Sequence, residues 1–376
     1  MPGDCGAFPD FPTLLREILQ GRSNGKIVWQ PRVCCYLSDR QFRGEPYPAP
    51  YAGMSEMEIF RAMRMSNRLY DFNACVNYEY HHSGVHVHWR DLDDLHLEYR
   101  IETPKGTLTQ LYRRNTANYG SYTVKWLVET EEEMKLLIWL EEQSSFSFSQ
   151  EKFDELLAQQ GDLGLPCMYL QRTNLLRLFY EHCGVENTIF ALADFPDTVE
   201  AYFDVLNRKQ EALCHLAGQS PFEWINFGDN VHCGMLPPNL FKKYVLPEYC
   251  RRNEILHGYG KFTHAHWDGD VKALLPYAKE TMLDGIEAIT PIPQGDVTLE
   301  EMKEHLGDMF LIDGIPAVYF DAEFPVETLI AHTKRCIELF APRLILGISD
   351  EMSSRGEMDR LLVVRDVVEN YNARMG

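Results

Sequence analysis

The stretch that decides the fold is KFTHAHWDGDVKALLPYAKETMLDGIEAIT (261–290), in which two short apolar segments enclose a longer one. KFTHAH (261–266) and GIEAIT (285–290) have the length and apolar content of buried strands. VKALLPYAKET (271–281) between them has the spacing of a helix. Strand–helix–strand units of this size pair their strands in parallel, so the stretch predicts an α/β fold.

The same alternation continues on both sides of this stretch. Further strands are predicted at 165–170, 222–228, 309–314 and 343–349, each followed by a helical segment. KIVWQPRVCCYL (26–37) reads as another buried strand, and one more near 73–78 brings the number to eight. Eight such units in 376 residues predict a single domain over 1–376, a TIM (β/α)8 barrel with an N-terminal extension. A doubly wound sheet is the alternative, but its nucleotide-binding forms lose support because the chain has neither a G-x-G-x-x-G after the first strand nor a P-loop.

One region breaks the alternation. In residues 80–127, Val85, Val87 and Trp89 alternate with histidines, and a Pro-Lys-Gly turn at 104–106 separates two further strand-like runs. We interpret 80–127 as an antiparallel β meander inserted into the barrel. Three capping-box patterns, beginning at Ser55, Thr130 and Thr298, predict the first turns of helices.

The charge and composition exclude several classes of function. With 36 Lys and Arg against 56 Asp and Glu, the net charge is −20, and no basic block occurs. Nucleic acid and anionic membrane surfaces are therefore not expected partners. No stretch approaches the 18 or so apolar residues of a membrane span, and the N-terminus lacks the pattern of a signal peptide. The ten cysteines include no C-x-x-C pair, so we expect a cytoplasmic protein with reduced thiols, most of them in the core.

Polar residues gather where the predicted strands end, which is where TIM barrels carry their active sites. His264, His266 and Asp268 alternate along one strand end, so they share a side if the strand stays extended. Glu287, Asp313 and Asp350 lie at or just after neighbouring strands. A histidine with several carboxylates suits either a divalent cation or a set of groups that transfers protons. The structural alternative is that one histidine forms a hydrogen bond in the core and the other caps the following helix.

Two other polar pairs have competing interpretations. Asp229 and Asn230 follow a predicted strand, where they serve either an Asx-turn or contact with substrate or metal. Asp350 and Glu351 precede the last helix, where acidic residues also favour the helix dipole.

Several segments together resemble the uroporphyrinogen decarboxylase superfamily. They are HAHWDGDVKALLPYAKETMLDGIEAITPIPQGDVTLEE (264–301), RLILGISDEM (343–352), QPRVCCYL, YAGMSEMEI (51–59), ETPKGTLT (102–109) and FGDNVHCGMLPPNLFKKYVLP (227–247). The resemblance runs over most of 26–372 and is better to the branch of corrinoid-dependent methyltransferases. It implies the TIM barrel that the alternation predicts.

The chain departs from the decarboxylases of this superfamily at the first strand. They carry an Arg-Gln-Ala-Gly segment that binds substrate carboxylates. This chain has LSDRQFRGEP at that place, in which only Arg40-Gln41 is similar. The Asp that binds pyrrole nitrogens also has no counterpart between 60 and 100. The resemblance therefore favours methyl transfer over porphyrinogen decarboxylation.

The resemblance also implies a metal site. The methyltransferases hold zinc with a His-x-Cys pair and a later Cys, and these positions align with His266, Asp268 and Asp350. A site with two carboxylates in place of two thiolates suits zinc, manganese or iron, and Glu287 is a further candidate ligand. On this hypothesis the metal is a Lewis acid, a partner protein supplies the corrinoid, and the substrate is a small methylated molecule. Asp229 and Asn230 would orient the substrate, and His264 would be a proton donor or a partner of the metal ligands. The alternatives are a metal-free lyase for a carboxylated ring substrate and a non-catalytic protein that binds a small molecule or corrinoid.

Overall fold

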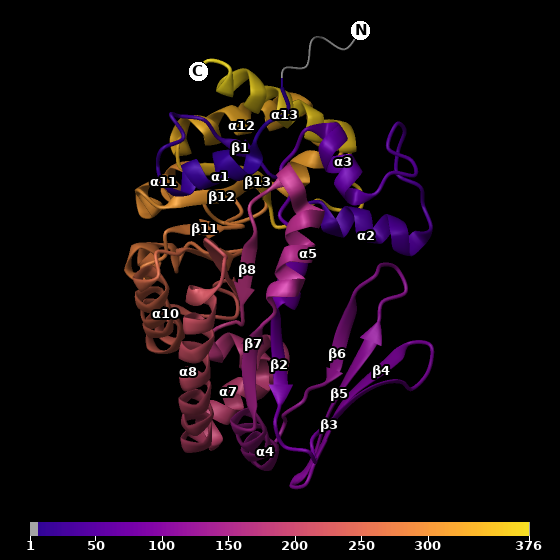
Figure 1. Ribbon diagram of the computed structural model, residues 1–376, viewed down its shortest axis with the longest axis vertical. Helices are drawn as coiled ribbons and strands as arrows, with labels where there is room; N and C mark the ends of the chain where they lie inside the picture. The colour runs from indigo at the N-terminus through magenta and orange to yellow at the C-terminus, as the bar shows by residue number, and fades with distance from the viewer. Residues whose placement is uncertain (1–6, 376) are drawn as a thin grey trace.

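The computed structural model describes residues 7–375 and centres on a parallel sheet of seven strands (Figure 1). Along the sheet the strands are β1 (Val28–Trp29), β13 (Leu344–Ser349), β12 (Phe310–Pro316), β11 (Gly285–Glu287), β10 (Phe262–Trp267), β9 (Trp224–Val231) and β8 (Cys167–Leu170). All neighbours pair in parallel, and the sheet curls into a half-barrel consistent with a TIM-like barrel.

The gap between the sheet edges β1 and β8 is spanned by residues 65–69 rather than by an eighth strand. Ser66 donates its backbone N–H to the Trp29 carbonyl on one side, and Asn67 donates to the Leu163 carbonyl on the other. A strand is present near the predicted 73–78, as β2 (Val76–Tyr80), but it pairs antiparallel outside the barrel, so the prediction of an eighth barrel strand there is wrong. Residues Tyr70–Cys75 form a 3-10 helix, and the chain then leaves the barrel as an antiparallel strand.

The chain between 76 and 148 lies outside the barrel sheet. β2 (Val76–Tyr80) pairs antiparallel with β7 (Ser144–Phe148), and between them the chain forms a separate four-stranded antiparallel sheet, seen at the lower right of Figure 1. Its strands are β3 (His86–Asp91), β4 (His96–Thr103), β5 (Gly106–Arg114) and β6 (Ser121–Lys125). The predicted meander over 80–127 is thus present within 86–125.

The helices lie mostly between consecutive strands. They are α1 (Phe11–Leu19), α2 (Cys34–Arg43), α3 (Glu56–Met63), α4 (Glu131–Glu142), α5 (Gln150–Gln160), α6 (Asn174–Arg177), α7 (Val185–Asp194), α8 (Pro196–Gln219), α9 (Pro238–Leu240), α10 (Leu246–Gly258), α11 (Leu299–Leu306), α12 (Val326–Phe340) and α13 (Met358–Asn372). Short 3-10 segments cover Gly161–Leu163, Leu275–Thr281 and Ala317–Phe320, and π-helical turns cover Leu178–His182 and Phe241–Val245. The capping boxes at Ser55, Thr130 and Thr298 are confirmed at the starts of α3, α4 and α11.

Two other element predictions need correction. The strand predicted over 26–37 is only Val28–Trp29, because Pro31 has no N–H for a sheet ladder and α2 starts at Cys34. The helix predicted over 271–281 is a 3-10 helix from Leu275, since Pro276 falls inside the predicted segment.

One large apolar core joins the barrel to the inserted sheet. Trp29, Phe227 and Trp267 of the barrel belong to the same buried cluster as Ile101 and Leu108 of β4 and β5. Among the residues described, no helix combines the length and apolar character that a membrane crossing requires.

Candidate functional site

Three side chains predicted as metal ligands meet at the carboxyl ends of the barrel strands. His266 lies near the end of β10, Asp268 just beyond it, and Asp350 directly after β13. One ligand atom from each lies within 4.8 Å of the others. The parallel arrangement explains the meeting, because strand ends far apart in sequence open on the same edge of the sheet.

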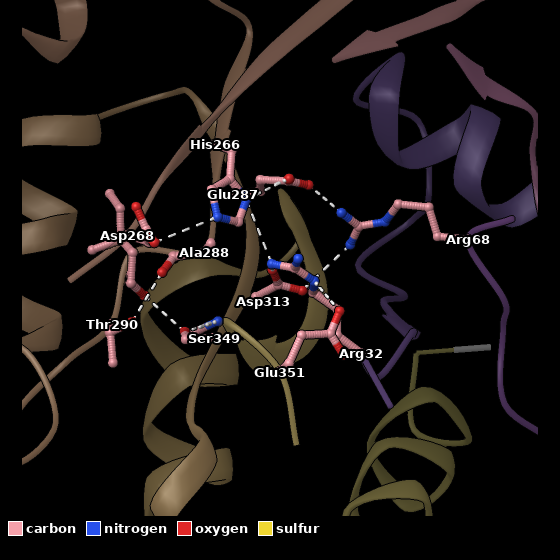
Figure 2. Close-up of polar contacts among 12 residues, drawn as sticks. Arg32, Arg68, His266, Asp268, Glu287, Ala288, Thr290, Asp313, Ser349 and Glu351 are labelled. Atoms are coloured by element: carbon pink, nitrogen blue, oxygen red, sulfur yellow. Dashed lines mark hydrogen bonds and ion pairs between the residues drawn. The ribbon is translucent and has the colours of Figure 1, made fainter. Parts of the chain in front are cut away.

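The orientation of His266 leaves one ring nitrogen available (Figure 2). Its Nδ1 lies 2.8 Å from Oε1 of Glu287, its register partner on β11. An ionised Glu287 accepts a hydrogen bond there, which places the proton on Nδ1. Nε2 then carries a lone pair and faces Oδ2 of Asp268 at 3.9 Å. A carboxylate behind a histidine is the usual support for a metal-binding imidazole.

Glu287 is ionised because of its cationic and hydrogen-bonding partners. Burial by itself raises its pKa, but Arg68 and hydrogen bonds from His264 and His266 together hold the pKa well below its usual range. Arg68 contacts Oε2, the oxygen that also lies 3.2 Å from Nε2 of His264. Both oxygens of Glu287 therefore have partners within the protein, and the carboxylate supports His266 from behind.

Asp268, whose Oδ2 faces this histidine, also has an unsatisfied acceptor. Its Oδ1 is buried without a hydrogen-bond partner among the described residues. Its Oδ2 accepts a long hydrogen bond, 3.4 Å, from Nδ2 of Asn230. A buried carboxylate oxygen without a donor is costly, and a cation bound by both oxygens of Asp268 would satisfy it. One imidazole nitrogen and two carboxylates form a donor set that fits a divalent cation.

Arg32 connects the site to the first strand of the barrel. It follows β1, and its Nη1 lies 3.5 Å from Nδ1 of His266 and 3.8 Å from Oδ2 of Asp313. Its Nε lies 3.3 Å from Oε1 of Glu351. Asp313 also pairs with Arg68 at 3.4 Å, yet burial dominates and raises the pKa of Asp313 to about 7.

The backbone is strained within β12 and directly after β11 and β13. Ala288, Asp313 and Asp350 have φ values of 67°, 77° and 67°, which side chains larger than glycine rarely adopt. Such outliers persist when surrounding contacts impose them, and they cluster at functional sites. Here they lie at β11, β12 and β13, which carry the polar groups of the site.

Some of the remaining predicted site residues contact this centre, and others are buried in the structure beneath it. His264 shares its side of β10 with His266 but is fully buried, and burial lowers its pKa.

Asp229 and Asn230 lie within β9 rather than in an Asx-turn after it. Asp229 is buried and accepts hydrogen bonds from the backbone N–H and hydroxyl of Thr173, at 2.7 and 3.2 Å. Asn230 joins Asp268 to Arg172, whose Nη2 donates to Oδ1 of Asn230 at 2.9 Å.

Asp350 and Glu351 are seven or more residues before α13 begins at Met358, so they do not belong to its first turn.

Sequence reasoning missed Arg32 and Arg68. Arg32 had a usable signal, because it follows a strand as the other site residues do, but the strand prediction extended past it to residue 37. Arg68 had none, because it lies in the irregular segment that spans the gap in the sheet.

Comparison with known proteins supports the fold. A methyltransferase from Methanosarcina mazei is similar over 96% of this chain and 99% of its own, at a TM-score of 0.58 and 11% identity. A B12-independent methionine synthase from Shewanella sp. W3-18-1 matches 90% of this chain and 86% of its own, at a TM-score of 0.45 and 11% identity. No protein-family model matches the sequence. No curated protein matches it either.

Proposed function

We propose that this protein is a metal-dependent methyltransferase that moves a methyl group between a small substrate and a corrinoid held by a partner protein. The observation that carries the proposal is the convergence of His266, Asp268 and Asp350, with a buried carboxylate oxygen lacking a donor. These three side chains would hold the cation. Once bound, it would supply a Lewis acid that polarises the heteroatom bearing the methyl group or activates its acceptor.

The charges around the site favour a cation over an anionic group. The site gathers five carboxyl groups, from Asp268, Glu287, Asp313, Asp350 and Glu351, around the guanidinium groups of Arg32 and Arg68. A third guanidinium group, that of Arg172, reaches Asp268 through Asn230, and Asp313 has a pKa of about 7, so the carboxylates still outnumber the cations. The nitrogen and oxygen donors suit zinc first, and manganese or iron as well.

The surrounding side chains have positioning roles in this proposal. Glu287 keeps the proton of His266 on Nδ1 and turns Nε2 toward the cation. His264 is the second partner of Glu287, so of the two roles predicted for it the geometry favours support of the ligand set. Asn230 orients Asp268, and Asp229 fixes the loop after β8 through Thr173.

Methyl transfer draws further support from the fold comparison and from the sequence resemblance. The similarity to the Methanosarcina methyltransferase extends over nearly the whole of both chains. The segments quoted from 264–301 and 343–352, which resemble corrinoid-dependent methyltransferases, contain all three proposed ligands.

A lyase that binds carboxylated substrates fits the site less well. Such an enzyme needs cationic side chains free to pair with the substrate. Arg68 is already paired with Glu287 and Asp313, and Arg32 with Asp313 and Glu351. Binding of carboxylates here would require these internal pairs to break.

The first test measures bound metal in the purified protein by elemental analysis. The His266→Ala variant should contain about one equivalent less zinc or other transition metal than the wild type, because it loses the ligand that Glu287 orients. His86→Ala, which removes an exposed histidine of β3, is the matched control and should keep the wild-type content. Equal metal content in the wild type and His266→Ala would exclude this metal site.

The second test measures the reaction. Cob(I)alamin serves as the surrogate for the corrinoid partner, and compounds with O-, N- or S-methyl groups are screened by the visible spectrum of methylcobalamin. Wild-type protein should form methylcobalamin from at least one class, and His266→Ala should not. Metal bound at His266 without methylation from any class, in either direction, would favour a binding protein.

A further inference from the structure

We propose that Cys34, Cys35 and Glu351 form a second cation site, separate from that of His266, which takes a thiophilic divalent metal such as zinc. The three residues lie beside the barrel mouth, and one ligand atom from each lies within 4.8 Å of the others. The proposal does not depend on methyl transfer, and it assigns these thiols a binding role instead of a place in the core.

The contacts of the cluster bring together segments from opposite ends of the chain. Cys34 Sγ lies 2.9 Å from Oε1 of Glu351, 317 positions later in the sequence. The backbone N–H of Cys35 donates to Oε2 of the same carboxylate at 3.4 Å. A tetrahedral zinc ion with bonds of about 2.3 Å to sulfur and about 2.0 Å to oxygen needs ligand atoms within about 4 Å of each other. Small rotations of these side chains meet that requirement.

The surroundings would offset part of the charge of a loaded site. Two thiolates and one carboxylate carry three negative charges against the two positive charges of a divalent cation, and Arg32, which also pairs with Asp313, lies beside them. Arg32 lies 3.3 Å from Glu351, close enough to hold the carboxylate in place. On the other side, the Tyr119 hydroxyl lies 3.1 Å from Cys35 Sγ and can donate to a thiolate there.

Accessibility distinguishes this pair from the other cysteines that the structure describes. Cys75, Cys167, Cys183, Cys214 and Cys336 are buried. Cys34 and Cys35 are partly exposed, so a metal ion can reach them from solvent. Cys233 and Cys250 are also partly exposed but belong to no comparable group of ligands among the described residues.

A cation here would join two parts of the molecule directly and a third through a hydrogen bond. Cys34 and Cys35 open α2, Glu351 follows β13, and Tyr119 lies in the loop between β5 and β6 of the inserted sheet. The site would therefore fix the inserted sheet against the barrel mouth, next to Asp350.

Cobalt substitution tests this site with a signal that the His266 site cannot produce. Metal-free, reduced protein is titrated with Co2+, and sulfur-to-cobalt charge transfer is followed in the near ultraviolet. The wild type and His266→Ala should both develop this band, because the thiolates are unchanged. The double variant C34S/C35S should lose it while remaining folded by circular dichroism, and C250S, the matched control, should keep it. Glu351→Gln should weaken cobalt binding about tenfold or more.

A second measurement on the wild type needs no variant. Bound zinc should protect two thiols from a chromogenic disulfide reagent, and a chelator should restore their reactivity. Absence of the band at saturating cobalt, its persistence in C34S/C35S, or equal thiol reactivity with and without zinc would each overturn the proposal. If His266→Ala loses metal and keeps the charge-transfer band, both sites are supported. If the band appears but no metal depends on His266, this site is supported and the proposed function is contradicted.

Discussion

Arg68 is the residue that balances the buried charges beneath the candidate site. Its guanidinium contacts Glu287 and Asp313, and all three side chains are at most 3% exposed. Nε also donates to Gln30 at 3.1 Å. Removing one partner of a buried ion pair leaves the others without compensation, which costs far more than losing an exposed pair.

Arg68→Met should therefore lower the free energy of unfolding by about 3–5 kcal/mol. Denaturant titration followed by circular dichroism measures the change. Arg335→Met is the matched control, since Arg335 pairs with Glu300 and Glu338 at the surface, and it should leave stability nearly unchanged. Similar losses in the two variants would contradict the assignment of Arg68 as a buried counter-charge.

The charge of His257 makes the stability of the fold depend on pH, in a direction that follows from its raised pKa. A hydrogen bond with Asp284, 3.0 Å long, raises the pKa of His257 against the opposing effect of partial burial. A raised pKa stabilises the fold fully below the unfolded-state value of about 6.5, and the stabilisation disappears as the pH rises through the folded value.

His257→Gln should consequently destabilise the protein more at pH 5.5 than at pH 9, by less than about 1 kcal/mol because the pair is partly exposed. Urea titrations of wild type and variant at both pH values give the difference. A larger loss at the higher pH would show that the charge of His257 does not stabilise the fold.

At the scale of elements, β12 and β13 depend on a close approach that only glycine permits. Gly347 of β13 lies opposite Gly314, beside the strained Asp313. A Cβ at Gly347 would collide with Oδ1 of Asp313 and come within 2.7 Å of the Gln30 carbonyl oxygen. The carbonyl belongs to the backbone just after β1, so it cannot rotate away.

Gly347→Ala should lower the free energy of unfolding by about 1–3 kcal/mol through overpacking. It should also weaken metal binding at His266, because Asp313 and the end of β13 shift together. Gly258→Ala is the control, since a Cβ at that position would have no neighbour within 4 Å among the described residues. Unchanged stability and metal binding in Gly347→Ala would mean that β12 and β13 can move apart at no cost in free energy.

At the scale of the whole molecule, the inserted sheet shares the barrel core. Ile101 and Leu108 are 2% and 0% exposed and belong to the same apolar cluster as Trp29 and Trp267. An insertion held by a shared core unfolds with its host, whereas one joined only through its surface unfolds separately.

Residues 86–125 should therefore unfold together with the barrel. Hydrogen exchange followed by mass spectrometry should show protected amides of β4 and β5 opening with those of β12 at moderate denaturant. Complete exchange of β4 and β5 while β12 remains protected would establish two independent units and contradict the prediction of a single domain over 1–376.

The order of the elements and the proposed ligands could be predicted from sequence because both depend on local pattern. Alternating apolar segments specify parallel strands, and parallel strands place their carboxyl ends on one edge, so a polar group that includes His266, Asp268 and Asp350 was predictable there. The choice of these three as the ligands came from the resemblance to the methyltransferases. The three capping boxes were predictable for the same reason, since each involves residues three apart.

Only the tertiary structure decided which distant side chains complete the site. Arg68 reaches Glu287 across 219 positions because an irregular segment, not a strand, spans the gap in the sheet. Cys34 meets Glu351 because β1 pairs with β13 and ends beside it. Such contacts depend on how the sheet curves and on which strands meet at its edges, and these are properties of the packed chain that no local sequence pattern encodes.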